Sequence, residues 1–126
     1  MKIGNLLFLS LILHLASPTL HGESIKVAFW NVENLFDMKD DPKTNDDEFA
    51  LGGKKNVTQE IYDLKLKNMA EVINALAADI LGLCEIENRF VLEELNKTVE
   101  RDYKIVHFDS PDNRGIDVAL LYDPKK

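Results

Sequence analysis

The pattern of hydrophobic and polar positions along the chain predicts four strands and two helices. Strands are expected at 25–30, 80–84, 103–108 and 116–122, where β-branched and aromatic residues concentrate. Apolar residues at helical spacing predict one helix that follows Thr58 and a second that follows Asn88, both residue types being good N-caps. The resulting order, β-α-β-α-β-β, places the chain in the α/β class.

The first residues have the pattern of an export signal. Lys2 precedes an apolar run from Leu6 to Ala16, and the small residue Gly22 follows. The run is short for a bilayer span of about 20 residues, so a cleaved signal is favoured over a stable membrane anchor. We therefore expect a signal peptide at 1–22, one domain at 23–126, and an exported protein, periplasmic or secreted. Cys84 is the only cysteine, which excludes an intramolecular disulfide and favours a packing role for this residue.

The charge balance limits the kinds of partner that the chain can bind by electrostatics alone. Acidic residues outnumber basic ones by 22 to 15, for a net charge of -7. Tight nonspecific binding of nucleic acid needs many Lys or Arg residues at phosphates, so the composition argues against it. A phosphate substrate is still compatible with this charge, because a bound cation can reverse the local field.

Polar side chains are expected to converge where the first two strands end. A strand-helix-strand unit makes these strands parallel, and open α/β sheets place their sites at the carboxyl ends of such strands. The first strand leads into Asn31 and Glu33, and the second into Glu85 and Glu87. If extended geometry persists, each pair shares one face, and oxygen ligands of this kind suit Mg²⁺ or Ca²⁺. Strands also commonly end in polar residues as they leave the core, and spacing alone does not decide between the two interpretations.

At these positions the chain resembles a known family. Residues 27–36 (VAFWNVENLF) and 79–85 (DILGLCE) resemble the first two motifs of the endonuclease/exonuclease/phosphatase superfamily, with Cys84 in place of the usual Gln. The chain also resembles a bacterial branch of this superfamily in five further segments. These are 40–42 (DDP), 45–49 (NDDEF), 86–89 (IENR), 106–112 (VHFDSPD) and 114–122 (RGIDVALLY). The ordered series of motifs spans nearly everything after the signal.

The resemblance implies a role for several of these residues. Glu85 would be a ligand of Mg²⁺, or of Mn²⁺ or Ca²⁺, and Asn31 would hold the metal or the scissile phosphate. Glu33 occupies a position where relatives carry an acidic group near the metal. The implied substrate is a phosphodiester, nucleic acid included. Arg114 would meet substrate phosphate through its fork of donors, and a solvated turn residue is an equally good interpretation of it.

Two further features are interpreted as structural. His107 matches a strand in the middle of the family's domain, whereas the family's catalytic His lies late in the domain. The acidic segment from Asp37 to Glu48 lacks the spacing of an EF-hand loop, so a solvated loop is favoured over a cation site there.

The resemblance also implies a four-layer α/β sandwich with two sheets, of which this chain corresponds to the amino-terminal, β-α-β-α-β-β half. The family's later Gly-Asp-x-Asn and Asp-His motifs do not occur in the sequence. We therefore expect a truncated domain whose carboxy-terminal half is missing, with one apolar sheet face uncovered and little or no activity alone. The alternatives are a non-enzymatic secreted remnant or binding module, and a phosphomonoesterase or lipid-phosphate hydrolase.

Overall fold

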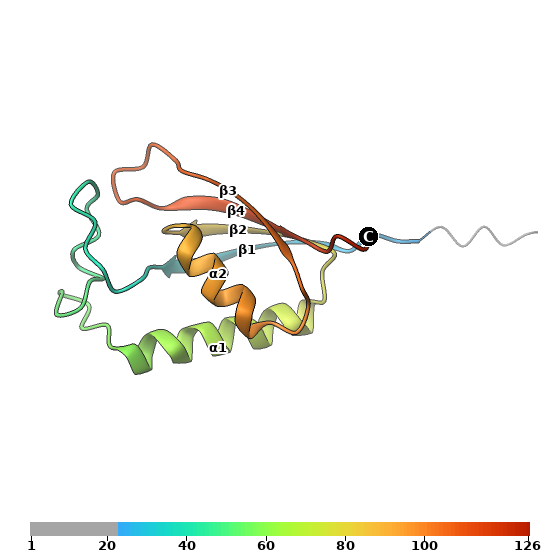
Figure 1. Ribbon diagram of the computed structural model, residues 1–126, viewed down its shortest axis with the longest axis horizontal. Coiled ribbons are helices and arrows are strands. Elements are labelled where there is room, and N and C mark those ends of the chain that lie inside the picture. Colours follow the sequence, from blue (N-terminus) through green and yellow to red (C-terminus); the bar gives the residue numbers. More distant parts are fainter. Residues whose placement is uncertain (1–22) are drawn as a thin grey trace, which may run out of the picture.

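The first two strands and the helix between them form the parallel unit that the sequence predicts. In the computed structural model, which describes residues 23–126, β1 (Val27–Leu35) and β2 (Ile80–Ile86) are parallel neighbours, and α1 (Gln59–Leu76) connects them (Figure 1). Asn31 of β1 lies opposite Cys84 of β2. The two strands therefore end at the same edge of the sheet. The signal peptide predicted at 1–22 lies outside the described residues.

The remaining elements complete one mixed sheet. They are α2 (Arg89–Thr98), β3 (Lys104–Phe108) and β4 (Asp117–Tyr122). The strand order is β1-β2-β4-β3, with β4 antiparallel to both of its neighbours. The mixed α/β class and the order of elements are thus confirmed, and the architecture is consistent with part of the sandwich that the sequence resemblance implies.

Both helices begin at the predicted capping residues. The Thr58 hydroxyl accepts a hydrogen bond from the Ile61 amide at 3.3 Å, and the Asn88 side chain accepts one from the Val91 amide at 3.0 Å. These contacts satisfy backbone donors that a first helical turn leaves without partners. Neither helix among the described residues is both long enough and apolar enough to cross a membrane.

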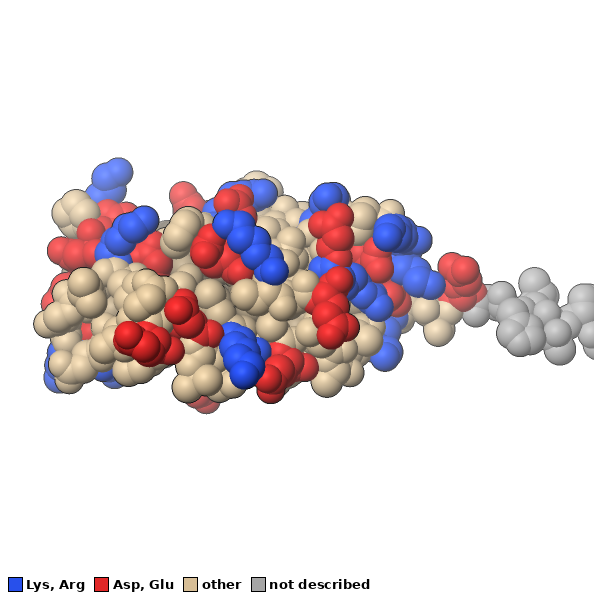
Figure 2. All heavy atoms as spheres, turned by 60° about the horizontal axis from the view of Figure 1, so that its bottom comes forward, with Lys and Arg blue, Asp and Glu red and all other residues tan. Residues whose placement is uncertain are grey.

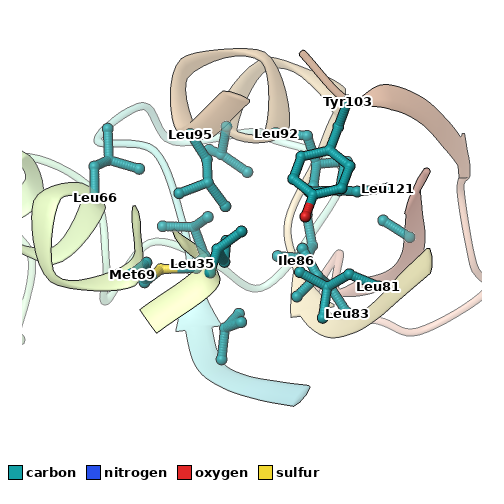
Figure 3. Packing of buried hydrophobic residues seen from close by; sticks show 14 of the residues in the cluster. Leu35, Leu66, Met69, Leu81, Leu83, Ile86, Leu92, Leu95, Tyr103 and Leu121 are labelled. Atoms are coloured by element: carbon teal, nitrogen blue, oxygen red, sulfur yellow. The ribbon is translucent and has the colours of Figure 1, made fainter. Parts of the chain in front are cut away.

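One face of the sheet packs against the helices and forms the core (Figure 3). Leu81 and Leu83 of β2 and Leu121 of β4 are fully buried on this face. The helices contribute Leu66, Met69, Ile73, Leu92 and Leu95 to the same cluster. Tyr103 joins the core and donates its hydroxyl hydrogen to the Ala78 carbonyl oxygen at 2.7 Å, so its one polar atom is satisfied.

The opposite face of the sheet is apolar and exposed. Alternation along β1, β3 and β4 turns large side chains to this face, and exposure reaches 71% at Phe29 and 77% at Phe108. Others on this face are Val27, Val106, Val118, Leu120 and Tyr122. Neither described helix packs on it. By contrast, the helical side carries interspersed acidic and basic side chains (Figure 2). We call this exposed surface the bare face.

Candidate functional site

Asn31 and Glu85 meet at the edge of the sheet where β1 and β2 end. The Asn31 side-chain amide donates a hydrogen bond to Glu85 Oε1 at 2.9 Å, although the residues are 54 positions apart in the chain. Asn31 has the same strand parity as Phe29, so its side chain emerges at the rim of the bare face. The loop 37–56 and the turn 109–116 lie at this same end of the sheet (Figure 1).

Irregular backbone geometry shapes both strands at this rim. The β1–β2 pairing shifts register between Asn31 and Leu35, and the β2–β4 pairing shifts between Cys84 and Ile86. Within these bulges Glu33, Asn34 and Glu85 adopt left-handed φ values of 53°, 64° and 62°. Such a conformation costs a non-glycine residue roughly 1–2 kcal/mol. Strained backbone of this kind clusters at functional sites.

Lys65 of α1 anchors the strained end of β1. Its ammonium group donates to the carbonyl oxygens of Glu33 and Asn34 at 2.6 and 2.9 Å. Burial lowers the pKa of Lys65, and the negative charges of Glu33 and Glu85 partly oppose this shift. This role of Lys65 could not be predicted from the sequence, because nothing in a helical Lys indicates a contact with backbone more than 30 residues earlier.

Glu87 does not share a face with Glu85, so the expectation of continued extended geometry was wrong. The left-handed turn at Glu85 redirects the chain, and Glu87 is 9% exposed, with its carboxylate accepting a hydrogen bond from the Asp37 amide. Burial, with the charges of Asp37 and Asp46, raises the pKa of Glu87 to about 7. Glu87 thus fastens the loop after β1 to the end of β2.

The acidic loop is more ordered than a solvated segment. Asp46 is only 1% exposed and accepts hydrogen bonds from the Asp41 amide at 3.1 and 3.3 Å. Phe36 and Phe49 stack with ring centroids 4.1 Å apart and close the base of the loop. The solvated-loop interpretation was therefore wrong for Asp37 and Asp46, which are buried. It holds for exposed Asp40 and Asp41.

Two of the residues assigned by resemblance lie in exposed positions. The Arg114 guanidinium binds the Asp112 carboxylate at 2.9 and 3.0 Å within the turn before β4, and it holds the pKa of Asp112 at about 2. The backbone amide of Glu33 is bound by Asn31 Oδ1 at 2.8 Å, while its side chain is exposed. A phosphate contact for Arg114 and a metal contact for Glu33 both stay predictions.

His107 lies in a buried pair with Asp117, a residue for which the sequence pattern predicted no role. His107 Nε2 and Asp117 Oδ2 are 2.8 Å apart, with side chains 5% and 4% exposed. Asp109 brings a third potential ligand atom within 4.8 Å of the other two. The sequence did contain a signal for this cluster. A His-x-Asp sequence ends one predicted strand, and an Asp lies at the start of the next.

The ligand chemistry of the Asn31–Glu85 pair fits a hard divalent cation. Glu85 uses Oε1 in the bond to Asn31, and the described residues give Oε2 no hydrogen-bond donor. A carboxylate and an amide oxygen at an exposed rim are ligands of the type that Mg²⁺ prefers. Cys84, which precedes Glu85, is half-buried, and burial raises the pKa of its thiol, so it is unsuited to a nucleophile's role.

Comparison with known proteins identifies one matching family. The sequence model of an Endonuclease/Exonuclease/phosphatase family matches residues 26–126. The match includes all six elements of the fold and every candidate residue at the rim. No curated protein and no solved structure matches the chain.

Proposed function

Because this chain belongs to the endonuclease/exonuclease/phosphatase family, we propose that it carries the metal-binding half of a phosphodiester hydrolase. The proposal rests mainly on one observation, the 2.9 Å contact between Asn31 and Glu85 at the ends of two parallel strands. Members of this family are generally metal-dependent, and Mg²⁺, Mn²⁺ or Ca²⁺ suits the oxygen ligands present here. Mg²⁺ is the ion that we propose.

Glu85 is proposed to be the main ligand of the ion. A divalent cation held by Glu85 would act as a Lewis acid and would neutralise negative charge on the phosphoryl oxygens of the ester. Asn31 orients the Glu85 carboxylate and offers an amide to the ion or to a phosphate oxygen, and Glu33 adds a negative charge beside it. The left-handed turn at Glu85, fixed by the neighbouring β4 pairing, holds the carboxylate at the rim before any ligand binds.

Arg114 is proposed to contact the substrate phosphate. It is exposed in the turn before β4, and the charge of Glu85 contributes to its raised pKa, after the larger effect of Asp112. Bound to Asp112, the guanidinium still has donors free for a phosphate oxygen. The mixed charge of the helical side (Figure 2) offers no continuous cationic groove, so the substrate is expected to bind at the rim, where the metal supplies positive charge.

The bare face suggests that the active form contains a second layer. An apolar surface with Phe29 and Phe108 more than two-thirds exposed is typical of an interface. We propose that further polypeptide, which also supplies the group that activates water, covers this face, and that the chain alone has little or no activity. The apolar run near the start of the sequence leads us to propose export as well.

The test compares wild-type protein with the Glu85→Gln variant, which keeps the size of the side chain and removes its charge. Mg²⁺ binding is measured by isothermal titration calorimetry on the chain. Hydrolysis of a phosphodiester substrate is measured after a carboxy-terminal half from another family member is supplied. We expect Glu85→Gln to lose both, with an unchanged circular dichroism spectrum. Glu71→Gln, an exposed acidic residue of α1, serves as the matched control. Unchanged Mg²⁺ binding in Glu85→Gln would remove the proposed site.

The second candidate is a binding function without catalysis, and the bare face is the observation that favours it. In that case the chain binds the carboxy-terminal half that is supplied to it. The resulting complex does not cleave DNA, RNA, a lipid phosphate or a phosphomonoester in the presence of Mg²⁺. Assaying these four substrate classes with one preparation separates the two candidates. It also determines which ester the enzyme prefers, whether a phosphodiester or a monoester.

A further inference from the structure

We propose that His107, Asp109 and Asp117 form a second metal site, selective for a transition-metal dication such as Zn²⁺. These residues come from the end of β3, the turn that follows it and the start of β4. One ligand atom from each lies within 4.8 Å of the other two. The site shares no residue with the Asn31–Glu85 pair, so it goes beyond the function proposed above.

The two sites lie on opposite faces of the sheet. His107 has the strand parity of Ile105, and Asp117 has that of Ala119 and Leu121, all on the helical side. Asn31 has the parity of Phe29 and belongs to the bare face. An ion held by His107 is therefore separated by the sheet backbone from the rim where Glu85 meets Asn31.

The ligands are positioned before an ion arrives. Asp117 Oδ1 accepts a hydrogen bond from the Ser110 amide at 2.7 Å, which leaves Oδ2 directed at His107 Nε2. The Ser110 hydroxyl donates to the Ile116 carbonyl oxygen at 2.7 Å and closes the turn. Outer contacts of this kind orient metal ligands. An ion between Nε2 and Oδ2 needs these atoms to separate by only about 0.5 Å from their present 2.8 Å.

A hollow of about 370 Å³ gives an ion access to the site. It is lined by Asp109 and Asp117 together with Glu87, Asp112 and Asp41, and Lys43 is the one basic residue in its lining. A concave surface rich in carboxylates attracts cations and repels a free phosphate. Asp109 is exposed and lines this hollow, whereas the side chains of His107 and Asp117 are buried.

The imidazole nitrogen determines which ion is favoured. Mg²⁺ and Ca²⁺ prefer oxygen ligands, whereas one imidazole with two carboxylates suits Zn²⁺ and its first-row neighbours. The rim pair offers only oxygen ligands, so excess Mg²⁺ should occupy the rim and leave the His107 site free for Zn²⁺.

A purely structural His107–Asp117 ion pair is the competing explanation, and Asp109 distinguishes the two. The ion pair does not use Asp109, whose side chain is exposed and makes no ion pair among the described residues. Replacement of Asp109 should therefore leave folding unchanged in both cases, and it should weaken ion binding only if the site exists.

Zn²⁺ binding is measured by calorimetry in excess Mg²⁺, on the full chain with His14→Gln and His21→Gln, so that His107 is its only imidazole. We expect one bound ion, a shift of the His107 ring Nε2 resonance in NMR spectra, and at least tenfold weaker binding in Asp109→Asn. Asp102→Asn, an exposed change elsewhere, should bind as the parent does. Glu85→Gln should also bind as the parent does, which separates this site from the proposed function.

Absence of Zn²⁺ binding, or equal affinity in Asp109→Asn, would overturn the proposal. If Glu85→Gln loses Zn²⁺ binding and Asp109→Asn retains it, the ion binds at the rim, and the proposal of a second site is likewise overturned. Because Asp109→Asn changes an exposed side chain, its result does not depend on whether a His107 variant folds.

Discussion

The side-chain amide of Asn31 donates a hydrogen bond to the carboxylate of Glu85 across the ends of two parallel strands, at 2.9 Å. Among the described side chains, Asn31 is the only one that donates a hydrogen bond to Glu85, and its amide is neutral. The contact holds the carboxylate without cancelling its charge, which is what a metal ligand requires before its ion arrives.

Asn31→Asp should make the stability of the chain depend on Mg²⁺. Two carboxylates in place of an amide and a carboxylate repel each other, at a cost of about 1 kcal/mol when both are fully exposed to water. A loss of this size lowers Tm by roughly 4–8 °C in a domain of this size. Mg²⁺ between them removes the repulsion. Thermal unfolding with and without Mg²⁺ measures the effect. The control is Asn68→Asp, at an exposed position of α1. An equal Tm change in the two variants would contradict a shared cation.

Glu87 should make stability fall as pH rises from about 5 to 8. Its pKa is raised from 4.5 to about 7 in the folded protein, so the folded state binds more protons than the unfolded state between these values. Stability is therefore lost as pH rises through 7, by an amount on the order of 3 kcal/mol. Glu87→Gln removes this dependence and should be more stable than wild type at pH 8, yet similar at pH 4.5. Urea unfolding at several pH values measures it.

The control for this experiment is Glu71→Gln, an exposed change that leaves Glu87 in place. Its free energy of unfolding should follow the wild-type pH dependence. If Glu87→Gln retains that dependence as well, another group is responsible for it.

Much of the fold could be predicted from the sequence because its signals are local. Thr58 and Asn88 cap helices through contacts with amides three residues away, and alternation along 116–122 reports which side chains face the core. The two strand ends could be placed at one edge of the sheet because a strand-helix-strand unit has few allowed topologies. These inferences need no knowledge of distant contacts.

The site was harder to predict because its details depend on backbone irregularities and remote partners. Nothing in the sequence CEIEN indicates that Glu85 adopts a φ of 62°, and that one angle sends Glu87 away from the rim. Asp46 is buried because it binds the Asp41 amide inside a folded loop. Polar composition predicts exposure on average, and it does not report which carboxylate a loop folds around.

Ala77→Gly should stabilise the chain by about 1 kcal/mol. Ala77 ends α1 with a left-handed φ of 45°, and its amide donates to the Ile73 carbonyl oxygen at 3.0 Å. Glycine adopts this conformation without the steric cost of a Cβ atom and is favoured at the end of a helix. Chemical denaturation measures the change, and Ala75→Gly, inside α1, should instead destabilise by a similar amount. Destabilisation by both variants would contradict the left-handed cap.

Replacement of bare-face residues should reduce the exposed apolar surface and leave folding intact. Phe108 and Val118 are 77% and 63% exposed, so Phe108→Ser and Val118→Ser should each alter the free energy of unfolding by no more than about 0.5 kcal/mol. Both should reduce binding of a hydrophobic dye, because less apolar surface meets water. Leu121→Ala, on the buried face of the same strand, should cost about 2–5 kcal/mol. If Phe108→Ser destabilises the chain as strongly as Leu121→Ala, the bare face is already covered in solution, and the proposal that a separate layer must be supplied fails.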